Sequence, residues 1–199
     1  MSGEAPSAWV ARWSHLVPKG ACVLDLACGR GRHARLFHGN GHPVVMVDRD
    51  AAALESIALP DVNEVPAEKI PADIESGPWP LDNRQFAGVV VTNYLWRPLF
   101  PRILASLAPG GVLLYETFAR GNETVGKPSR PDFLLRTGEL LDLCAGLRIV
   151  AYENGFIDAP GGMGAKFVQR IVAAREAQTS GTAESAPAMP ARYSLGSPG

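Results

Sequence analysis

The 199-residue sequence lacks the features that mark nucleic-acid-binding and membrane-spanning proteins. Its formal net charge is -1 and its pI about 6.4, so no overall positive field is available to hold phosphate groups, and nucleic acid is not expected as a partner. No apolar run approaches the length of a membrane span, and the first 20 residues hold no unbroken apolar segment of the kind found in secretory signals. We therefore expect a cytoplasmic protein without a membrane partner.

Cysteine is scarce and is not arranged in pairs. Cys22, Cys28 and Cys144 include no Cys-x-x-Cys spacing, which favours reduced thiols over disulfides. The 4 histidines also lack the spacing of a metal site, so no metal is expected. With 46% hydrophobic and 20% charged residues, the composition suits one globular domain with a minor appendage.

The most informative feature that is present is a buried strand followed by a glycine-rich turn. The apolar run 22–27 predicts a strand buried on both faces, and Gly29 and Gly31 predict a tight turn whose backbone approaches a ligand. The helix expected after the turn would direct its free amides to the same place. By itself, the pattern formed by Gly29, Gly31 and Ala34 also fits the fingerprint that binds NAD or FAD.

Asp25 distinguishes these possibilities, because an acid inside an apolar strand is costly to bury without a partner. An acid, three residues and Gly-x-Gly make up the first motif of the class I S-adenosylmethionine (SAM)-dependent methyltransferases. The segment Asp25–His33 resembles the small bacterial, tellurite-resistance-like type of that family, and the resemblance covers residues 23–175. It implies that SAM is the cofactor, that Asp25 lies near its amino acid portion, and that Ala27, Gly29 and Gly31 border it. The alternative is that Asp25 caps a neighbouring amide and the glycines only form a turn.

The order of elements predicts an α/β fold with a doubly wound, mostly parallel seven-stranded sheet. Because the last two strands are joined by a short turn, they should form an antiparallel hairpin, which is typical of the Rossmann-like methyltransferase fold. The predicted strands are 22–27, 44–47, a short one ending at 72, 88–92, 111–116, 147–153 and 166–173, and the predicted helices are 7–16, 32–38, 50–58, 97–107 and 137–144.

Three regions are expected along the chain. Residues 1–20 form a helical lead, residues 21–175 the SAM-binding methyltransferase domain, and residues 176–199 a tail with too few bulky apolar side chains to fold.

Two acids at the ends of predicted strands are candidates for binding adenosine. Asp48 ends the second strand and can accept both ribose hydroxyls, whereas Asp50 is the better helix cap. By the resemblance, Asp73 meets the adenine amino group and Ile74 packs on the purine. If the register of the third strand differs, Glu75 or Glu68 takes the place of Asp73.

The end of the fourth strand lies at the point where ligands enter such sheets. Asn93 is a candidate for holding the methionine end of the cofactor, and Tyr94 and Glu116 are candidates for the acceptor pocket, Glu116 as a base. The alternative for Tyr94 and Trp96 is a place in the core. The region 121–136 predicts a long loop over the mouth of the site, with residues that either shape the acceptor pocket or are simply solvated: Asn122, Glu123, Lys127, Arg130 and Arg136.

The sequence thus predicts a SAM-dependent methyltransferase that acts on a small-molecule acceptor. Two alternatives remain open at this point: a non-catalytic SAM- or nucleotide-binding module that acts through partners, and an NAD-linked oxidoreductase. Neither the acceptor nor the oligomeric state follows from the sequence.

Overall fold

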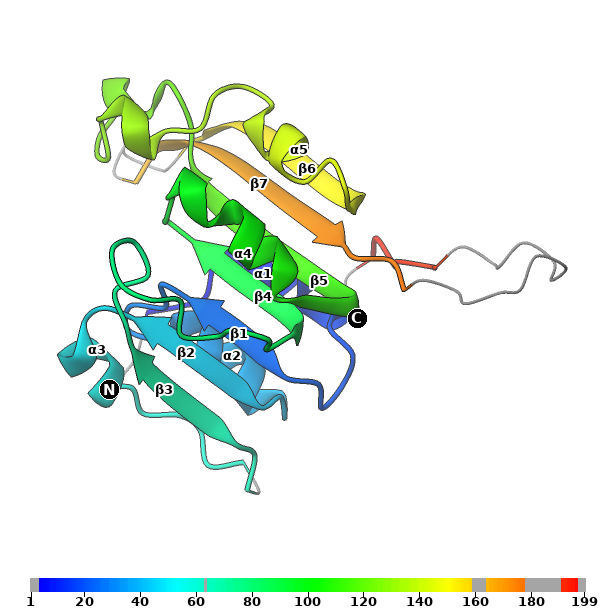
Figure 1. The fold of residues 1–199 in the computed structure, drawn as a ribbon. Coiled ribbons are helices and arrows are strands. Elements are labelled where there is room, and N and C mark those ends of the chain that lie inside the picture. Colours follow the sequence, from blue (N-terminus) through cyan, green and yellow to red (C-terminus); the bar gives the residue numbers. More distant parts are fainter. Residues whose placement is uncertain (1–3, 63, 159–163, 178–190, 197–199) are drawn as a thin grey trace, which may run out of the picture.

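The computed structural model describes residues 4–62, 64–158, 164–177 and 191–196, and its centre is a seven-stranded sheet (Figure 1). The strand order is β3-β2-β1-β4-β5-β7-β6; the first five strands in this order are parallel, and β7 is antiparallel to both β5 and β6. This confirms the predicted sheet and its C-terminal hairpin. The strands are Val23–Leu26 (β1), Val44–Asp48 (β2), Ala67–Pro71 (β3), Phe86–Thr92 (β4), Leu107–Phe118 (β5), Arg148–Ile157 (β6) and Lys166–Ala174 (β7).

Helices cover both faces of the sheet, as a parallel sheet requires. Two buried clusters show the division: α4 and α5 pack on one face, in front in Figure 1, and α1, α2 and α3 on the other. The helices are Ala8–Trp13 (α1), Arg32–Gly39 (α2), Ala51–Glu55 (α3), Phe100–Ala105 (α4) and Glu139–Leu143 (α5), with 3₁₀ turns at Ser14–Leu16 (η1), Arg97–Leu99 (η2), Asn122–Thr124 (η3) and Pro131–Phe133 (η4).

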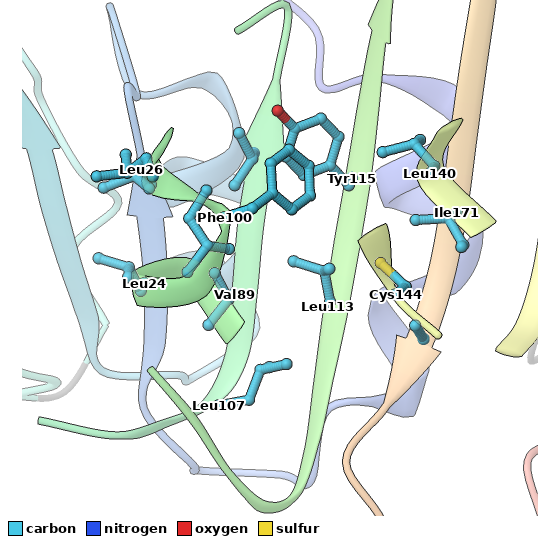
Figure 2. Close-up of a cluster of buried hydrophobic side chains, with 14 of the residues drawn as sticks. Leu24, Leu26, Val89, Phe100, Leu107, Leu113, Tyr115, Leu140, Cys144 and Ile171 are labelled. Atoms are coloured by element: carbon cyan, nitrogen blue, oxygen red, sulfur yellow. The ribbon is translucent and has the colours of Figure 1, made fainter. Parts of the chain in front are cut away.

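Alternation along β1 decides which side chains reach which face. Leu24 and Leu26 belong to the cluster under α4 and α5, which also contains the stacked rings of Phe100 and Tyr115 (Figure 2). Val23 belongs to the opposite cluster, under α1 and α2. Asp25 therefore points to the α2 side, where the helix begins that follows the glycine turn.

Four predicted helices (7–16, 50–58, 97–107 and 137–144) are shorter in the structure, and for two of them the sequence gives a local cause. Helix α3 ends at Glu55 instead of residue 58, and the hydroxyl of Ser56 donates to the carbonyl of Ala53, a local bond that competes with helical pairing. The predicted helix 97–107 begins as the turn η2, and its α-helical part starts only at Phe100. Pro101 lacks the amide hydrogen that would bond to the carbonyl of residue 97 in an α-helix beginning there.

The predicted 176–199 tail is described only in part, since residues 178–190 and 197–199 lie outside the described residues. The segment 191–196 lies against the domain. The ring of Tyr193 packs beside the cluster under α1 and lies under the guanidinium of Arg148 at 5.9 Å, and the carbonyl of Ser194 is 3.1 Å from Nε2 of His15. These contacts join the end of the chain to both η1 and β6.

We expect Tyr193→Ala to lower the melting temperature by about 2 to 4 °C, because losing a partly buried ring costs about 1 kcal/mol in a domain of this size. Leu195→Ala is the matched control, since Leu195 is 62% exposed and should leave the melting temperature unchanged. Equal melting curves for both variants and the wild type would show that the docked segment contributes nothing to stability.

Candidate active site

The turn after β1 is built from backbone conformations that favour glycine. Ala27, Gly29 and Gly31 all have positive φ angles, of 52°, 54° and 69°. The amide of Cys28 donates to the carbonyl of Val47 at 3.1 Å, which fastens the turn to β2. Helix α2 starts directly behind Gly31, so the turn and the first amides of the helix share one edge of the sheet.

The two glycines of the turn face different surroundings. A Cβ atom added to Gly29 would have no heavy atom within 4 Å, whereas one added to Gly31 would lie 2.8 Å from Cδ1 of Ile57. Gly29 therefore leaves room on the open side of the turn, and Gly31 leaves room for the packing of Ile57. The expectation that both glycines border a ligand is supported by the geometry only for Gly29.

Asp25 is 1% exposed, and its Oδ2 accepts a hydrogen bond from the amide of Ala34 at 2.9 Å. It thus caps the first turn of α2, as the structural alternative predicts, and it does not line either of the cavities described below. Burial raises the pKa of Asp25 to about 7. The carboxyl group is therefore close to half-protonated at neutral pH, behind the glycine turn.

This raised pKa predicts how stability depends on pH. An unfolded Asp titrates near 3.8, so between about pH 4 and pH 7 the folded state binds the proton more tightly, and its free energy of unfolding falls as the pH rises. Over this window the loss is on the order of 3 to 4 kcal/mol. Asp25→Asn, whose carbonyl oxygen still accepts from Ala34, should remove this slope. Chemical unfolding of both proteins between pH 4 and pH 8 measures it, and parallel curves would contradict the prediction.

Asp48, at the end of β2, holds the glycine turn with one oxygen and the next turn with the other. Its Oδ2 accepts from the amide of Gly29 at 2.7 Å, and its Oδ1 accepts from the amide of Asp50 at 3.0 Å. Asp50 caps α3 through the amide of Ala53 at 2.9 Å, as predicted. The Asp48 carboxylate keeps unused lone pairs and borders a cavity.

That cavity, of about 220 Å³, opens at the carboxyl ends of the strands beside Asp48. It brings together residues that follow four different strands, and all but two of them belong to the predicted site or its alternatives. Its lining consists of Ala27, Asp48, Arg49, Ala72, Asp73, Ile74, Glu75, Asn93 and Tyr94.

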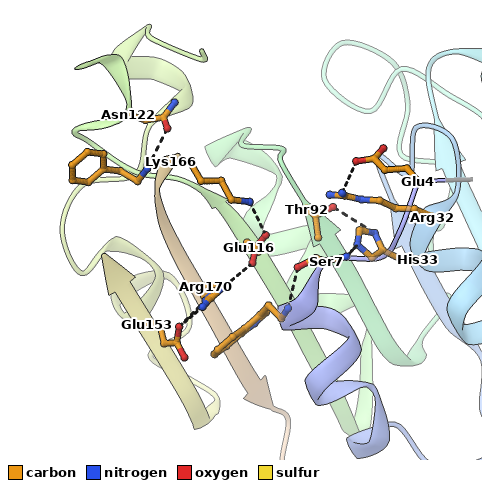
Figure 3. A network of polar contacts seen from close by, with 12 residues as sticks. Glu4, Ser7, Arg32, His33, Thr92, Glu116, Asn122, Glu153, Lys166 and Arg170 are labelled. Atoms are coloured by element: carbon orange, nitrogen blue, oxygen red, sulfur yellow. Dashed lines mark hydrogen bonds and ion pairs between the residues drawn. The ribbon is translucent and has the colours of Figure 1, made fainter. Parts of the chain in front are cut away.

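A second cavity of about 220 Å³ adjoins the first and shares Ala27 and Asn93 with it. The two lie side by side across the ends of β1 and β4, where the strand order reverses, and we call them together the cleft. The lining of the second cavity is Glu4, Ala27, Cys28, Gly29, Arg30, Arg32, Thr92 and Asn93. Within it, Nη1 of Arg32 forms an ion pair with Oε1 of Glu4 at 2.8 Å (Figure 3).

Asp73 and its neighbours form one wall of the first cavity. The carboxylate of Asp73 accepts from the amides of Glu75 and Ser76 at 3.0 and 3.3 Å, and bonds to Ser76 and Glu75 lower the pKa of Asp73. Of the two alternatives, Glu75 also lines this cavity, whereas Glu68 does not.

Two residues after β4 complete the first cavity. Asn93 has a φ of 54°, and its amide donates to the carbonyl of Glu116 at 2.9 Å, so the chain turns sharply there. The ring of Tyr94 packs partly against the core and also lines the cavity. Burial first, and then the neighbouring carboxylate of Glu75, raise the pKa of the Tyr94 hydroxyl above its ordinary value. Trp96, by contrast, is exposed and is not a core aromatic.

Glu116 lies one strand further along and lines neither cavity. Its side chain is 3% exposed, and its two oxygens form ion pairs with Nζ of Lys166 at 3.4 Å and with Nη1 of Arg170 at 3.3 Å (Figure 3). Both oxygens of the carboxylate are thus held by cations from β7. Glu116, which the sequence suggested as a base, therefore belongs to an ion-pair network between β5 and β7 in this structure.

The 121–136 region does not line the cleft either. It contains η3 and η4 and is held by Arg97, which donates to the carbonyls of Asp132 and Leu134 and pairs with Glu139 at 2.6 Å. Asn122 is buried, donates to the carbonyl of Pro128 and accepts from the amide of Phe167. The predicted loop is thus tied to β7.

Several cleft residues have no counterpart in the sequence prediction. Arg49 follows Asp48 directly, so its place after the strand was a usable signal. Glu4 and Arg32 come together only through tertiary structure, across 28 positions. In the described part of the chain, no group of His, Cys, Asp and Glu side chains is arranged to hold a metal ion.

The reversed strand β7 and the cleft at the ends of β1 and β4 define the fold of the class I methyltransferases. Residues 23–111 match the model of a family described as a methyltransferase domain. No curated protein matches the sequence. The chain thus contains a methyltransferase domain over residues 23–111, and SAM is the cofactor of this domain.

Solved structures with the same fold include two of the TehB type. TehB from Haemophilus influenzae has a TM-score of 0.65 at 16% identity; the match covers 82% of this chain but only 60% of that one. A TehB-like SAM-dependent methyltransferase from Corynebacterium glutamicum has a TM-score of 0.58 at 20% identity, covering 86% of this chain and 89% of that one. The chain is thus of the TehB-like type in its fold.

A third structure is a complex with the demethylated cofactor. The glycopeptide N-methyltransferase MtfA bound to S-adenosylhomocysteine (SAH) has a TM-score of 0.56 at 19% identity, covering 81% of this chain and 86% of that one.

Among the residues described, no helix is both long and apolar enough to cross a membrane.

Proposed function

We propose that this methyltransferase transfers the methyl group of SAM to a small-molecule acceptor, with the cofactor lying along the two adjoining cavities. The observation that supports the proposal is that Ala27 and Asn93 border both cavities, so the two lie close enough for one extended ligand to occupy them. Each cavity alone is smaller than most ligand sites, whereas the two together are within their usual range of about 300 to 1,000 Å³.

The first cavity suits adenosine. Asp48 offers lone pairs to two ribose hydroxyls, and Asp73 or Glu75 faces the adenine amino group. Ile74 supplies an apolar surface for the purine. Tyr94 borders the same cavity beside Glu75, so we assign this residue to the cofactor rather than to the acceptor.

The second cavity suits the methionine end of the cofactor, which carries an ammonium and a carboxylate. The paired Arg32 and Glu4 offer the two opposite charges at its edge. Gly29 leaves the open space beside them, and Asp25 lies behind the turn as its support.

SAM supplies a methyl group on a positively charged sulfur, and the acceptor atom attacks that carbon as the carbon–sulfur bond breaks. The protein accelerates such a displacement by holding the reacting atoms in line. A net charge of -1 gives no overall positive field to attract a nucleic acid acceptor, which favours small molecules.

The test is an acceptor screen with the purified protein, SAM and a small-molecule library, read out as SAH release. We expect turnover with one or more small acceptors. Release of SAH only with added protein or RNA would overturn the small-molecule part, and absence of SAM and SAH binding in calorimetry would overturn the cofactor site.

A further inference from the structure

His33, the second residue of α2, connects this helix to the segment before α1 and to the end of β4. All three segments border the second cavity. His33 is 1% exposed, and its Nε2 accepts a hydrogen bond from the amide of Ser7 at 3.2 Å. Because an amide can only donate, Nε2 carries no proton, and the proton of the neutral ring is on Nδ1. Nδ1 lies 3.5 Å from the hydroxyl of Thr92, at the end of β4 (Figure 3).

The ring stays neutral over the physiological range. Burial, with the charge of Arg32 as a smaller cause, lowers the pKa of His33 to about 3. A permanently neutral ring keeps its acceptor nitrogen available to Ser7, whereas a protonated ring would present a donor to a donor.

The segment Glu4–Ser7, which we call the strap, is fixed at both ends. At one end, Glu4 pairs with Arg32 at the rim of the cavity. At the other end, the hydroxyl of Ser7 caps α1 by accepting from the amide of Trp9 at 3.2 Å. Helix α1 is in turn anchored to the sheet, since Trp9 is buried and its Nε1 donates to the carbonyl of Ile171 at 3.4 Å.

Only two residues, Ala5 and Pro6, separate Ser7 from Glu4, and the proline ring restricts the backbone between them. The position of the Ser7 amide therefore limits where the Glu4 carboxylate can reach. His33 fixes the Ser7 amide relative to α2, to which it belongs, and to β4, which it contacts at Thr92. Arg32 of α2 and Thr92 of β4 line the same cavity.

We propose that His33 is a positioning residue for cofactor binding: it holds the strap so that Glu4, paired with Arg32, meets the amino acid end of the cofactor. The inference rests on the proposed function, because it takes the second cavity as the methionine end. It requires no contact between His33 and the cofactor.

The experiment compares two ligands by calorimetry: SAH, which has the amino acid end, and 5′-methylthioadenosine, which lacks it. His33→Phe keeps the ring shape and removes both nitrogens. We expect it to weaken SAH binding about tenfold, the equivalent of one lost hydrogen bond of about 1.4 kcal/mol, and to leave 5′-methylthioadenosine binding within about twofold. His33→Gln, which restores an acceptor, should recover part of the SAH affinity.

A pair of strap variants tests the same bond from the other side. Ser7 has a φ of -53°, which proline can adopt, so Ser7→Pro removes the amide hydrogen that His33 accepts as well as the capping hydroxyl. Ser7→Ala removes only the hydroxyl. We expect Ser7→Pro to weaken SAH binding about tenfold relative to Ser7→Ala. His42→Gln is the control for replacing a buried histidine elsewhere, since His42 contacts the carbonyl of Ala21.

The outcomes separate the inference from the proposed function. Equal losses for both ligands in His33→Phe would show a general structural role and overturn the inference. Unchanged SAH binding in His33→Phe and Ser7→Pro, with a loss in Arg32→Ala, would overturn the role of His33 and leave the methionine subsite standing. If Arg32→Ala and Glu4→Gln also bind SAH as the wild type does, the assignment of the second cavity is wrong.

Discussion

Replacing Asp48 with alanine is expected to weaken SAH binding by about 100-fold or more. The first reason is the loss of the two hydrogen bonds that, in the proposed site, the carboxylate accepts from ribose hydroxyls, each worth about 1.5 to 3 kcal/mol. The second is that Oδ2 of Asp48 accepts from the amide of Gly29 at 2.7 Å, so the variant also releases the turn that borders the second cavity. Titration calorimetry with SAH measures the combined effect.

A cofactor lacking the 2′-hydroxyl separates the two contributions. In the wild type its removal should weaken binding, whereas in Asp48→Ala it should cost little more, because the partner of that hydroxyl is already gone. Asp48→Asn keeps one acceptor oxygen and should give an intermediate affinity. If removing the 2′-hydroxyl weakens binding to the wild type and to Asp48→Ala by the same factor, Asp48 only holds the glycine turn in place.

Much of the fold was predictable because local pattern and tertiary structure agree in it. The apolar strands, the glycine turn after β1 and the short connection between β6 and β7 each restrict the possible arrangements, and the observed sheet order follows. The boundaries of α3 and α4 were less predictable. The hydroxyl of Ser56 shortens α3 and the missing amide hydrogen of Pro101 delays the start of α4, so each boundary depends on a single residue.

The cleft was predictable where its residues follow strands, and unpredictable where they meet only through packing. Asp48, Asp73 and Asn93 come directly after strands that end at one edge of the sheet. Glu116 comes from the same kind of position, near the end of β5, yet its surroundings differ, because β7 brings Lys166 and Arg170 against it. The sequence does not reveal which cations a distant strand will supply.

The contacts of the strap were also unpredictable from the sequence, because they are made only through packing. Glu4 precedes the first strand and has no motif around it, and its partner Arg32 lies beyond the glycine turn. Beside this ion pair, a second link between the two segments joins Ser7 to His33, residues that a sequence pattern assigns to a helix cap and to a helix interior. Contacts of this kind depend on where α1 packs, which no local pattern specifies.

Gly31→Val is expected to destabilise the protein by about 2 to 5 kcal/mol, which lowers the melting temperature by roughly 5 to 15 °C. Gly31 has a φ of 69°, which a β-branched residue adopts only under strain, and its added Cβ would lie 2.8 and 2.9 Å from Cδ1 and Cγ2 of Ile57. Gly31→Val thus disturbs mainly the packing of the start of α2 against Ile57, and its effect on cofactor binding is secondary.

Gly29→Val is the matched variant. Gly29 has a similar φ of 54°, so both variants carry the same kind of strain, but a Cβ at Gly29 meets no neighbour within 4 Å and stands on the open side of the turn. We expect Gly29→Val to melt closer to the wild type than Gly31→Val does, and to lose more SAH affinity per degree of lost stability. Adding Ile57→Ala should recover part of the stability of Gly31→Val and none of that of Gly29→Val. The opposite pattern, with Gly31→Val well folded and unable to bind SAH, would show that Gly31 and not Gly29 makes room for the cofactor.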